Sequence, residues 1–174
     1  MHGNPQETLF AYIAGIIDGE GTVFICKTLT DYQKENGRLK NPKYVAGISV
    51  KMTNKKPIQF IYDVTKLGVV YRIGARLGRE QHKPFWEWKA GKTDGVPFIK
   101  LIRKYLLVKD KQADLFVKFY ENKKAPFDRQ KGLSPKELQW REDMRLQMCE
   151  LNRLGVLATT ESFGAERSSD SLNS

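Results

Sequence analysis

The spacing of apolar residues predicts a helix near the start of the chain and several more in its second half. Leu9, Tyr12, Ile13, Ile16 and Ile17 follow the i, i+3, i+4, i+7 pattern of an amphipathic helix over residues 7–18. The same spacing predicts helices from Pro57 to a stop at Gly68, over residues 98–106 and 113–120, and from a Ser134 cap to about Leu154. Most of the second half of the chain is therefore expected to be helical.

Alternation of apolar and polar residues predicts four strands among these helices. Residues 44–53 are the clearest case, because Tyr44, Ala46, Ile48, Val50 and Met52 fall on one face and mostly polar residues on the other. Further strands are expected over residues 22–30, 69–78 and 84–91, with a hairpin turn at Asn36-Gly37. The order α-β-β-α-β-β-α-α-α predicts an α+β domain in which helices cover one face of an antiparallel sheet.

The segment AYIAGIIDGEGTVFI, residues 11–25, joins the first helix to the first strand. Asp18 and Glu20 stand at this junction, beside Gly19 and Gly21. Glycine permits close approach of the backbone and an abrupt change of direction. Mg²⁺ binds through one or two carboxylates together with carbonyl and substrate phosphate oxygens. The junction is therefore a candidate metal site at which a phosphate backbone can be bound.

Composition adds a strong positive charge to this picture. The 174 residues include 30 Lys and Arg against 20 Asp and Glu, a net charge of +10, which favours a polyanionic partner such as nucleic acid, an acidic membrane or an acidic protein. Cys26, Cys149, His2 and His82 are too isolated to suggest a zinc site. No stretch resembles a signal peptide or a membrane span, so we expect an intracellular, soluble protein of a microbial cytoplasm or an organelle, and not a secreted one.

The polar face of the sheet is a candidate DNA surface, since a two-stranded ribbon fits the major groove. Strand alternation and the tip of the first hairpin nominate as DNA contacts Thr28, Thr30, Arg38, Lys40, Ser49, Lys51, Arg72, Arg76, Glu87 and Lys89. A solvated sheet face that binds nothing would show the same alternation. The pattern alone therefore leaves both interpretations open.

The stretch IAGIIDGEG, residues 13–21, resembles the signature motif of the LAGLIDADG homing endonucleases and matches it at Ala14, Gly15, Ile17, Asp18 and Gly21. The expected order of elements is also similar to that family's αββαββα core with extra C-terminal helices. The resemblance implies one core domain over residues 1–157, whose antiparallel hairpins form a DNA-binding saddle. It also implies site-specific, Mg²⁺-dependent hydrolysis of DNA. The Ser-rich segment 158–174 is expected to be a disordered tail.

The resemblance further implies roles for individual residues. Glu20 would hold the metal ion with help from the Gly19 carbonyl oxygen, and Asp18 would have a structural role at the helix end. Lys109, within LVKDKQADL, would stabilise charge on the phosphate, and Asn54, within MTNKK, would orient the attacking water. Plainer roles stay open, with Lys109 as a solvated lysine at a helix start and Asn54 as the cap of the following helix.

The motif occurs once, which implies a homodimer. Two copies of the first helix would meet through Tyr12, Ala14 and Gly15, so that each copy acts on one strand of a long, roughly palindromic target. The implied partners are double-stranded DNA and a second copy of the chain, with no membrane. The alternative is an RNA maturase, or a sequence-specific DNA-binding protein that does not cut, on the same fold.

Overall fold

The computed structural model describes residues 4–28, 42–74, 83–125 and 132–165, with side chains described up to residue 153. The elements are α1 (Pro5–Glu20), β1 (Gly21–Thr28), β2 (Lys43–Met52), α3 (Lys55–Thr65), β3 (Val69–Ile73), β4 (Phe85–Ala90), α4 (Lys92–Ile102), the 3₁₀ turn η1 (Arg103–Tyr105), α5 (Asp110–Asn122) and α6 (Pro135–Ala165). The predicted α+β class and the order αββαββα followed by further helices are confirmed.

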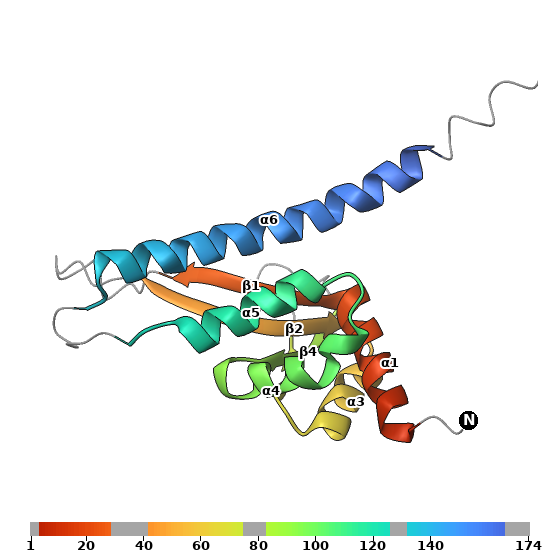
Figure 1. Ribbon diagram of the computed structural model, residues 1–174. Helices are drawn as coiled ribbons and strands as arrows, with labels where there is room; N and C mark the ends of the chain where they lie inside the picture. Colours follow the sequence, from red (N-terminus) through yellow and green to blue (C-terminus); the bar gives the residue numbers. More distant parts are fainter. Residues whose placement is uncertain (1–3, 29–41, 75–82, 126–131, 166–174) are drawn as a thin grey trace, which may run out of the picture.

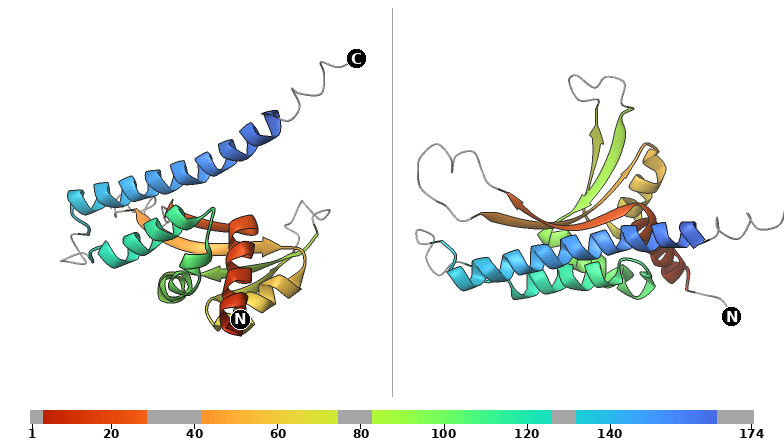
Figure 2. Two further views of the ribbon diagram at one scale, coloured as in Figure 1. Left: turned by 45° about the vertical axis from the view of Figure 1, so that its right-hand side comes forward. Right: turned by 90° about the horizontal axis from the view of Figure 1, so that it is seen from above.

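The four strands form one antiparallel sheet in the order β1-β2-β4-β3. β1 pairs with β2, and β3 pairs with β4. The two pairs join through β2 and β4, where Val50 lies opposite Trp88. The helices gather on one side of the sheet (Figure 1). The sheet is curved, and its other side is open and lies inside the curve (Figure 2, right).

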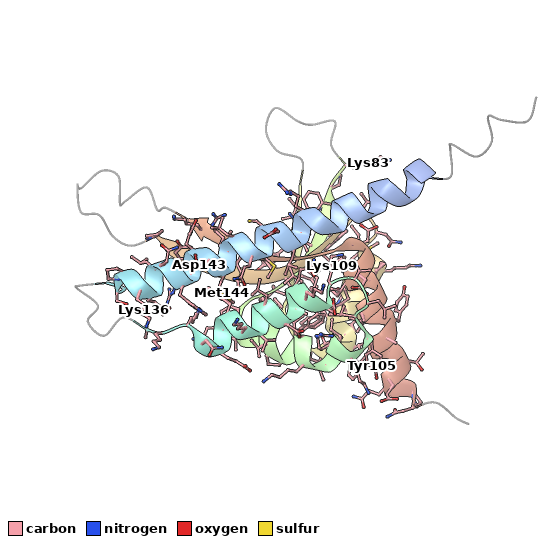
Figure 3. The ribbon with its side chains drawn as sticks, turned by 45° about the horizontal axis from the view of Figure 1, so that its top comes forward. Lys83, Tyr105, Lys109, Lys136, Asp143 and Met144 are labelled. Atoms are coloured by element: carbon pink, nitrogen blue, oxygen red, sulfur yellow. The ribbon has the colours of Figure 1, made fainter. Side chains whose placement is uncertain are left out.

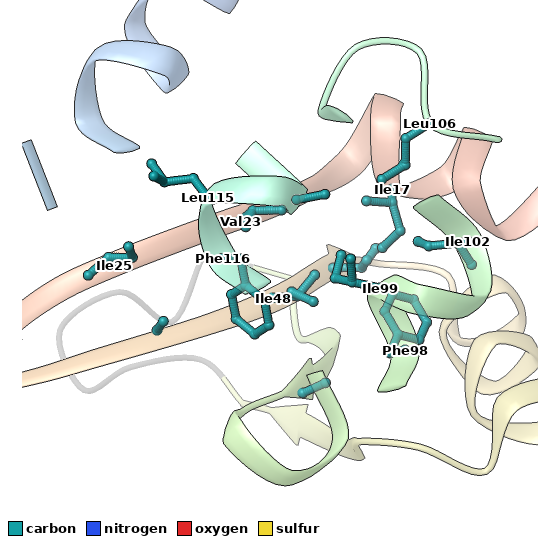
Figure 4. Packing of buried hydrophobic residues seen from close by; sticks show 14 of the residues in the cluster. Ile17, Val23, Ile25, Ile48, Phe98, Ile99, Ile102, Leu106, Leu115 and Phe116 are labelled. Atoms are coloured by element: carbon teal, nitrogen blue, oxygen red, sulfur yellow. The ribbon is translucent and has the colours of Figure 1, made fainter. Parts of the chain in front are cut away.

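The core lies between the sheet and the helices. It is built from the inward side chains of the strands, such as Ile48, and from apolar faces of α1, α4 and α5, including Ile17, Phe98 and Phe116 (Figure 4). Trp88 is fully buried, and its indole N–H donates to the Leu67 carbonyl oxygen at 2.9 Å. Burial of this apolar face fixes which side of the sheet remains free.

Several helices differ in extent from the sequence-based expectation. α4 covers Lys92–Ile102 rather than residues 98–106, and residues 103–105 form η1. α1 continues to Glu20, so both acidic residues of the junction lie in its last turn. α6 continues to Ala165 rather than ending near Leu154. Gly155 follows Leu154 directly, but a glycine inside a helix costs only about 1 kcal/mol, and no proline occurs between Gly155 and Ala165. Part of the expected tail is therefore helical, and residues 166–174 lie outside the described residues, as does the Asn36-Gly37 turn. No described helix combines the length and the apolar character needed to cross a membrane.

A carboxylate on α6 ties that helix to the sheet. The Tyr44 hydroxyl donates to Glu142 Oε2 at 2.6 Å, the Arg145 guanidinium donates to Oε1 at 2.6 Å, and the Lys27 ammonium lies 3.4 Å from Oε2. Hydrogen bonds from Arg145 and Tyr44 lower the pKa of Glu142 to about 2. The same contact, together with burial, raises the pKa of Tyr44 to about 12.

Replacing Glu142 with glutamine is expected to destabilise the fold by about 1–2 kcal/mol at pH 7. The folded-state pKa lies below the ordinary value of 4.5, so the stabilisation is complete above that pH and is lost as the pH falls towards 2. Urea unfolding from pH 7 to pH 2 measures it: wild type and Glu142→Gln should converge at the acid end. Asp143→Asn, at the exposed neighbouring position, is the control and should cost little at any pH.

Candidate active site

The junction between α1 and β1 requires glycine at one position. Gly21 ends α1 with an extended backbone, and its N–H donates to the Ile17 carbonyl oxygen. A Cβ atom at Gly21 would lie 2.5 Å from that same oxygen. Glycine is therefore needed for the helix to give way directly to the first strand, and this turn places Glu20 at the end of the sheet.

Asp18 holds the loop that precedes α5. Its Oδ2 accepts the Leu107 backbone N–H at 2.8 Å, and its Oδ1 accepts the Lys109 backbone N–H at 2.9 Å. Both carboxylate oxygens are thus used within the protein. The structural role expected for Asp18 agrees with this geometry, since the side chain connects the end of α1 to a loop far away in the sequence.

Lys109 lies against the end of α1, at the start of α5 (Figure 3). Its ammonium donates to the Asp18 carbonyl oxygen, one of the groups that a helix C-terminus leaves without an intrahelical partner. Burial lowers the pKa of Lys109, while the charges of Asp18 and Glu20 oppose that shift. Lys109 is therefore not simply a solvated lysine, because it is half-buried beside both carboxylates.

An arginine that sequence reasoning missed supports the same loop from the other side. Arg103, in η1, makes a bidentate pair with Asp114 of α5, with distances of 2.5 and 2.7 Å, and lies 3.8 Å from Asp110. This pair raises the pKa of Arg103 and lowers that of Asp114. Because the contact spans the loop, it holds the two helical segments on either side of Lys109 together.

Glu20 is exposed and, within the part of the chain that the structure describes, has no hydrogen-bond or ion-pair partner. Gly19 beside it is exposed as well, and the space next to its Cα is open. The described residues contain no group of three or more His, Cys, Asp or Glu side chains arranged to hold a metal ion.

Asn54 fills one of its two expected roles, that of a helix cap. Its side-chain oxygen accepts the Lys56 backbone N–H at 3.0 Å and caps α3. The amide oxygen is thereby committed to the helix, as usual for asparagine at this position.

The open face of the sheet carries several of the expected DNA contacts. Lys51 and Glu87 lie opposite each other on β2 and β4 and form an ion pair at 3.9 Å. Lys89 lies opposite Ser49, and cross-strand partners share a face. Ser49 is largely buried, and the Thr28 hydroxyl donates to the Lys43 carbonyl oxygen at 3.2 Å. Thr30, Arg38, Lys40 and Arg76 lie outside the described residues.

Arg72 does not lie on the open face, contrary to expectation. It pairs with Trp86, and the next inward residue of β3, Val70, pairs with Trp88 and packs against the core. Tyr71 occupies the open face instead, opposite Glu87, and is 47% exposed. A shift of one residue in strand phase exchanges the two faces, and the sequence-based assignment of β3 was wrong by that one residue.

The outward side of α1 differs from the expected dimer surface at one position. Tyr12 is 56% exposed and Gly15 is exposed with open space beside it, as expected. Ala14 is fully buried in the core, so its assignment to the interface was wrong. Successive helix positions are 100° apart, so Ala14 and Gly15 face different ways. The exposed small residues are Ala11, Gly15 and Gly19, which are four apart and share one stripe.

Three solved structures resemble this chain along most of its length. The homing endonuclease I-CvuI in complex with its target gives a TM-score of 0.62 at 17% identity, covering 84% of this chain and 83% of that one. The archaeal intron-encoded homing endonuclease I-Vdi141I, complexed with DNA, gives 0.61 at 13% identity, with coverages of 84% and 85%. The LAGLIDADG homing endonuclease I-GzeII, in complex with a DNA target, gives 0.54 at 15% identity, with coverages of 80% and 43%. The chain has the LAGLIDADG endonuclease fold. No protein-family model and no curated protein matches the sequence.

The LAGLIDADG fold of this chain brings part of the predicted site together and leaves part of it apart. Asp18, Glu20 and Lys109 come together at the end of α1, although Lys109 follows Asp18 by 91 positions in the sequence. Asn54 lies at the start of α3, where its side-chain oxygen caps the helix. The bidentate partner of Arg103 lies eleven positions away, and no sequence motif signalled that pair.

Proposed function

We propose that this protein is a site-specific, Mg²⁺-dependent DNA endonuclease that acts as a homodimer. The observation that carries the proposal is the exposed Glu20 carboxylate at the junction of α1 and β1, close in the chain to the Asp18 carbonyl oxygen that binds the half-buried Lys109 ammonium. A basic chain with an open, curved sheet suits a duplex. A carboxylate and an ammonium at the end of that sheet suit hydrolysis of a phosphodiester.

The donors around Glu20 suit Mg²⁺. This ion keeps several waters and commonly uses one or two carboxylates together with substrate phosphate oxygens. Glu20 and the Gly19 carbonyl oxygen would hold it, since both belong to the exposed end of α1. When bound, Mg²⁺ supplies positive charge at the phosphate and lowers the pKa of a coordinated water.

The remaining residues supply the positive charge of Lys109 and hold its loop in place. The Lys109 ammonium stabilises the negative charge that grows on the phosphate during hydrolysis. Asp18 and the Arg103–Asp114 pair keep the Lys109 loop fixed, so that the ammonium does not reorganise during the reaction. The cap on α3 uses only the Asn54 side-chain oxygen, so the amide nitrogen of this exposed residue is left to orient the attacking water.

A second copy of the chain completes the proposed enzyme. One chain offers one Glu20, whereas a duplex has two strands, and this chain matches only 43% of the longer I-GzeII protein. The stripe of Ala11, Gly15 and Gly19 on α1 would let two helix backbones approach closely. A twofold dimer through α1 would present two equivalent sheets to a nearly palindromic target.

Replacing Gly15 with leucine is expected to weaken self-association by at least about tenfold while leaving the monomer folded, because the position faces open space within the chain. Sedimentation velocity over a concentration series measures the effect. Lys118→Leu adds the same side chain at an exposed position of α5 and should leave association unchanged. Equal self-association of Gly15→Leu and wild type would exclude α1 as the interface.

Incubation with a randomised duplex library, with and without Mg²⁺, tests the proposed activity. We expect double-strand cuts only with Mg²⁺, at one long sequence related to itself by a twofold axis. Sequence-specific binding that never leads to cutting would favour the DNA-binding alternative. Selective binding of structured RNA in a parallel pool, without DNA cleavage, would favour the maturase alternative.

A further inference from the structure

A phenylalanine lies on the open face of the sheet, on the edge strand β1. Phe24 of β1 pairs with Gly47 of β2, so its ring lies on the open face rather than in the core. The side chain is only partly buried. A partly exposed aromatic ring at this place has no role in the packing of the core, because Val23 and Ile25 on either side of it provide that packing.

Gly47 makes room for this ring. A Cβ atom at Gly47 would lie 2.6 Å from Phe24 Cζ and 3.1 Å from Cε1. The tip of the ring therefore lies across the neighbouring strand, where any other residue would displace it. The ammonium of Lys89 lies 5.4 Å from the ring centroid, at cation–π distance. The result is an apolar platform with a positively charged donor at its edge.

We propose that Phe24 recognises the C5-methyl group of a thymine in the major groove. Of the four bases only thymine presents a methyl group there, and apolar side chains contact it directly. The platform is apolar, rigidly supported by Gly47 and placed on the face that would enter the groove. Lys89 would bind an adjacent guanine edge or phosphate. This inference rests on the DNA binding proposed above.

Substitution of deoxyuridine for thymidine tests the proposal, because it removes only the methyl group. A duplex is first selected from a randomised library without Mg²⁺, and each thymidine in one half-site, with its symmetry mate, is then replaced in turn. We expect one position at which wild-type binding weakens about 15-fold, as for the loss of two buried methyl groups, one in each half-site. Phe24→Gln should bind the two duplexes equally, and Phe24→Leu should retain part of the difference.

Two further variants separate the ring from the rest of the face. Gly47→Ala keeps Phe24 but displaces its ring, so the preference for thymidine should shrink. Lys51→Ala, which alters another open-face residue, should retain it. Circular dichroism confirms folding of each variant. If no position responds to deoxyuridine, or if Phe24→Gln retains the response, the proposal is overturned. Failure of wild type to select any duplex would instead overturn the proposed function.

Discussion

Replacing Glu20 with glutamine is expected to slow DNA cleavage by about 10³-fold or more while leaving specific DNA binding within about threefold of wild type. The amide has nearly the same shape as the carboxylate but no negative charge to hold Mg²⁺. Glu20 makes no hydrogen bond or ion pair among the described residues, so its replacement should leave the fold intact. Cleavage rates at saturating DNA, with binding measured separately by fluorescence anisotropy, give the two quantities.

Glu150→Gln provides the matched control, because Glu150 is exposed on α6 and, like Glu20, makes no hydrogen bond or ion pair among the described residues. It should cut at the wild-type rate. Restoring cleavage in Glu20→Gln by raising the Mg²⁺ concentration would mean weakened binding of the ion, which still supports its role as a ligand. Wild-type cleavage by Glu20→Gln at ordinary Mg²⁺ would contradict the assignment.

The elements of this fold could be predicted from sequence because each has a clear period, and some also have a clear boundary. Gly21 shows how local such a signal is: its lack of a side chain is required by the Ile17 carbonyl oxygen only four positions earlier. Other glycines and prolines gave no such boundary: α6 runs through Gly155 to Ala165, and Pro97 lies inside α4. Such a residue therefore marks the end of an element only where the surrounding backbone requires it.

Strand and helix phase were harder to predict than element type. On β3, both Val69-Tyr71-Ile73 and Val70-Arg72 contain apolar residues, so alternation alone does not say which set faces inward. Pairing of Val70 with the buried Trp88 decides it. On α1, adjacent small residues were both assigned to the surface, although Ala14 completes the core stripe. Such assignments need the tertiary partner, which a single sequence does not contain.

The second large effect is expected at Lys109. Lys109→Met keeps most of the length of the side chain and removes its charge, so cleavage should fall about 10²–10³-fold with little change in specific DNA binding. Single-turnover rates on the selected duplex measure the chemical step. Lys111→Met is the control: Lys111 lies two positions further along and lines the groove between α5 and α6. Equal rates for Lys109→Met and Lys111→Met would contradict a role in catalysis.

Asp18 should act on the reaction only through Lys109. Asparagine at this position keeps one acceptor oxygen for the two backbone N–H groups that the carboxylate holds, so the loop loosens and cleavage should fall about tenfold. In the Lys109→Met background the same change should leave the cleavage rate almost unchanged, because the position of residue 109 no longer matters once its charge is gone. A double-mutant cycle of single-turnover rates measures this coupling. Additive losses would mean that Asp18 contributes independently, for example as a second metal ligand, and would overturn its assignment as a positioning residue.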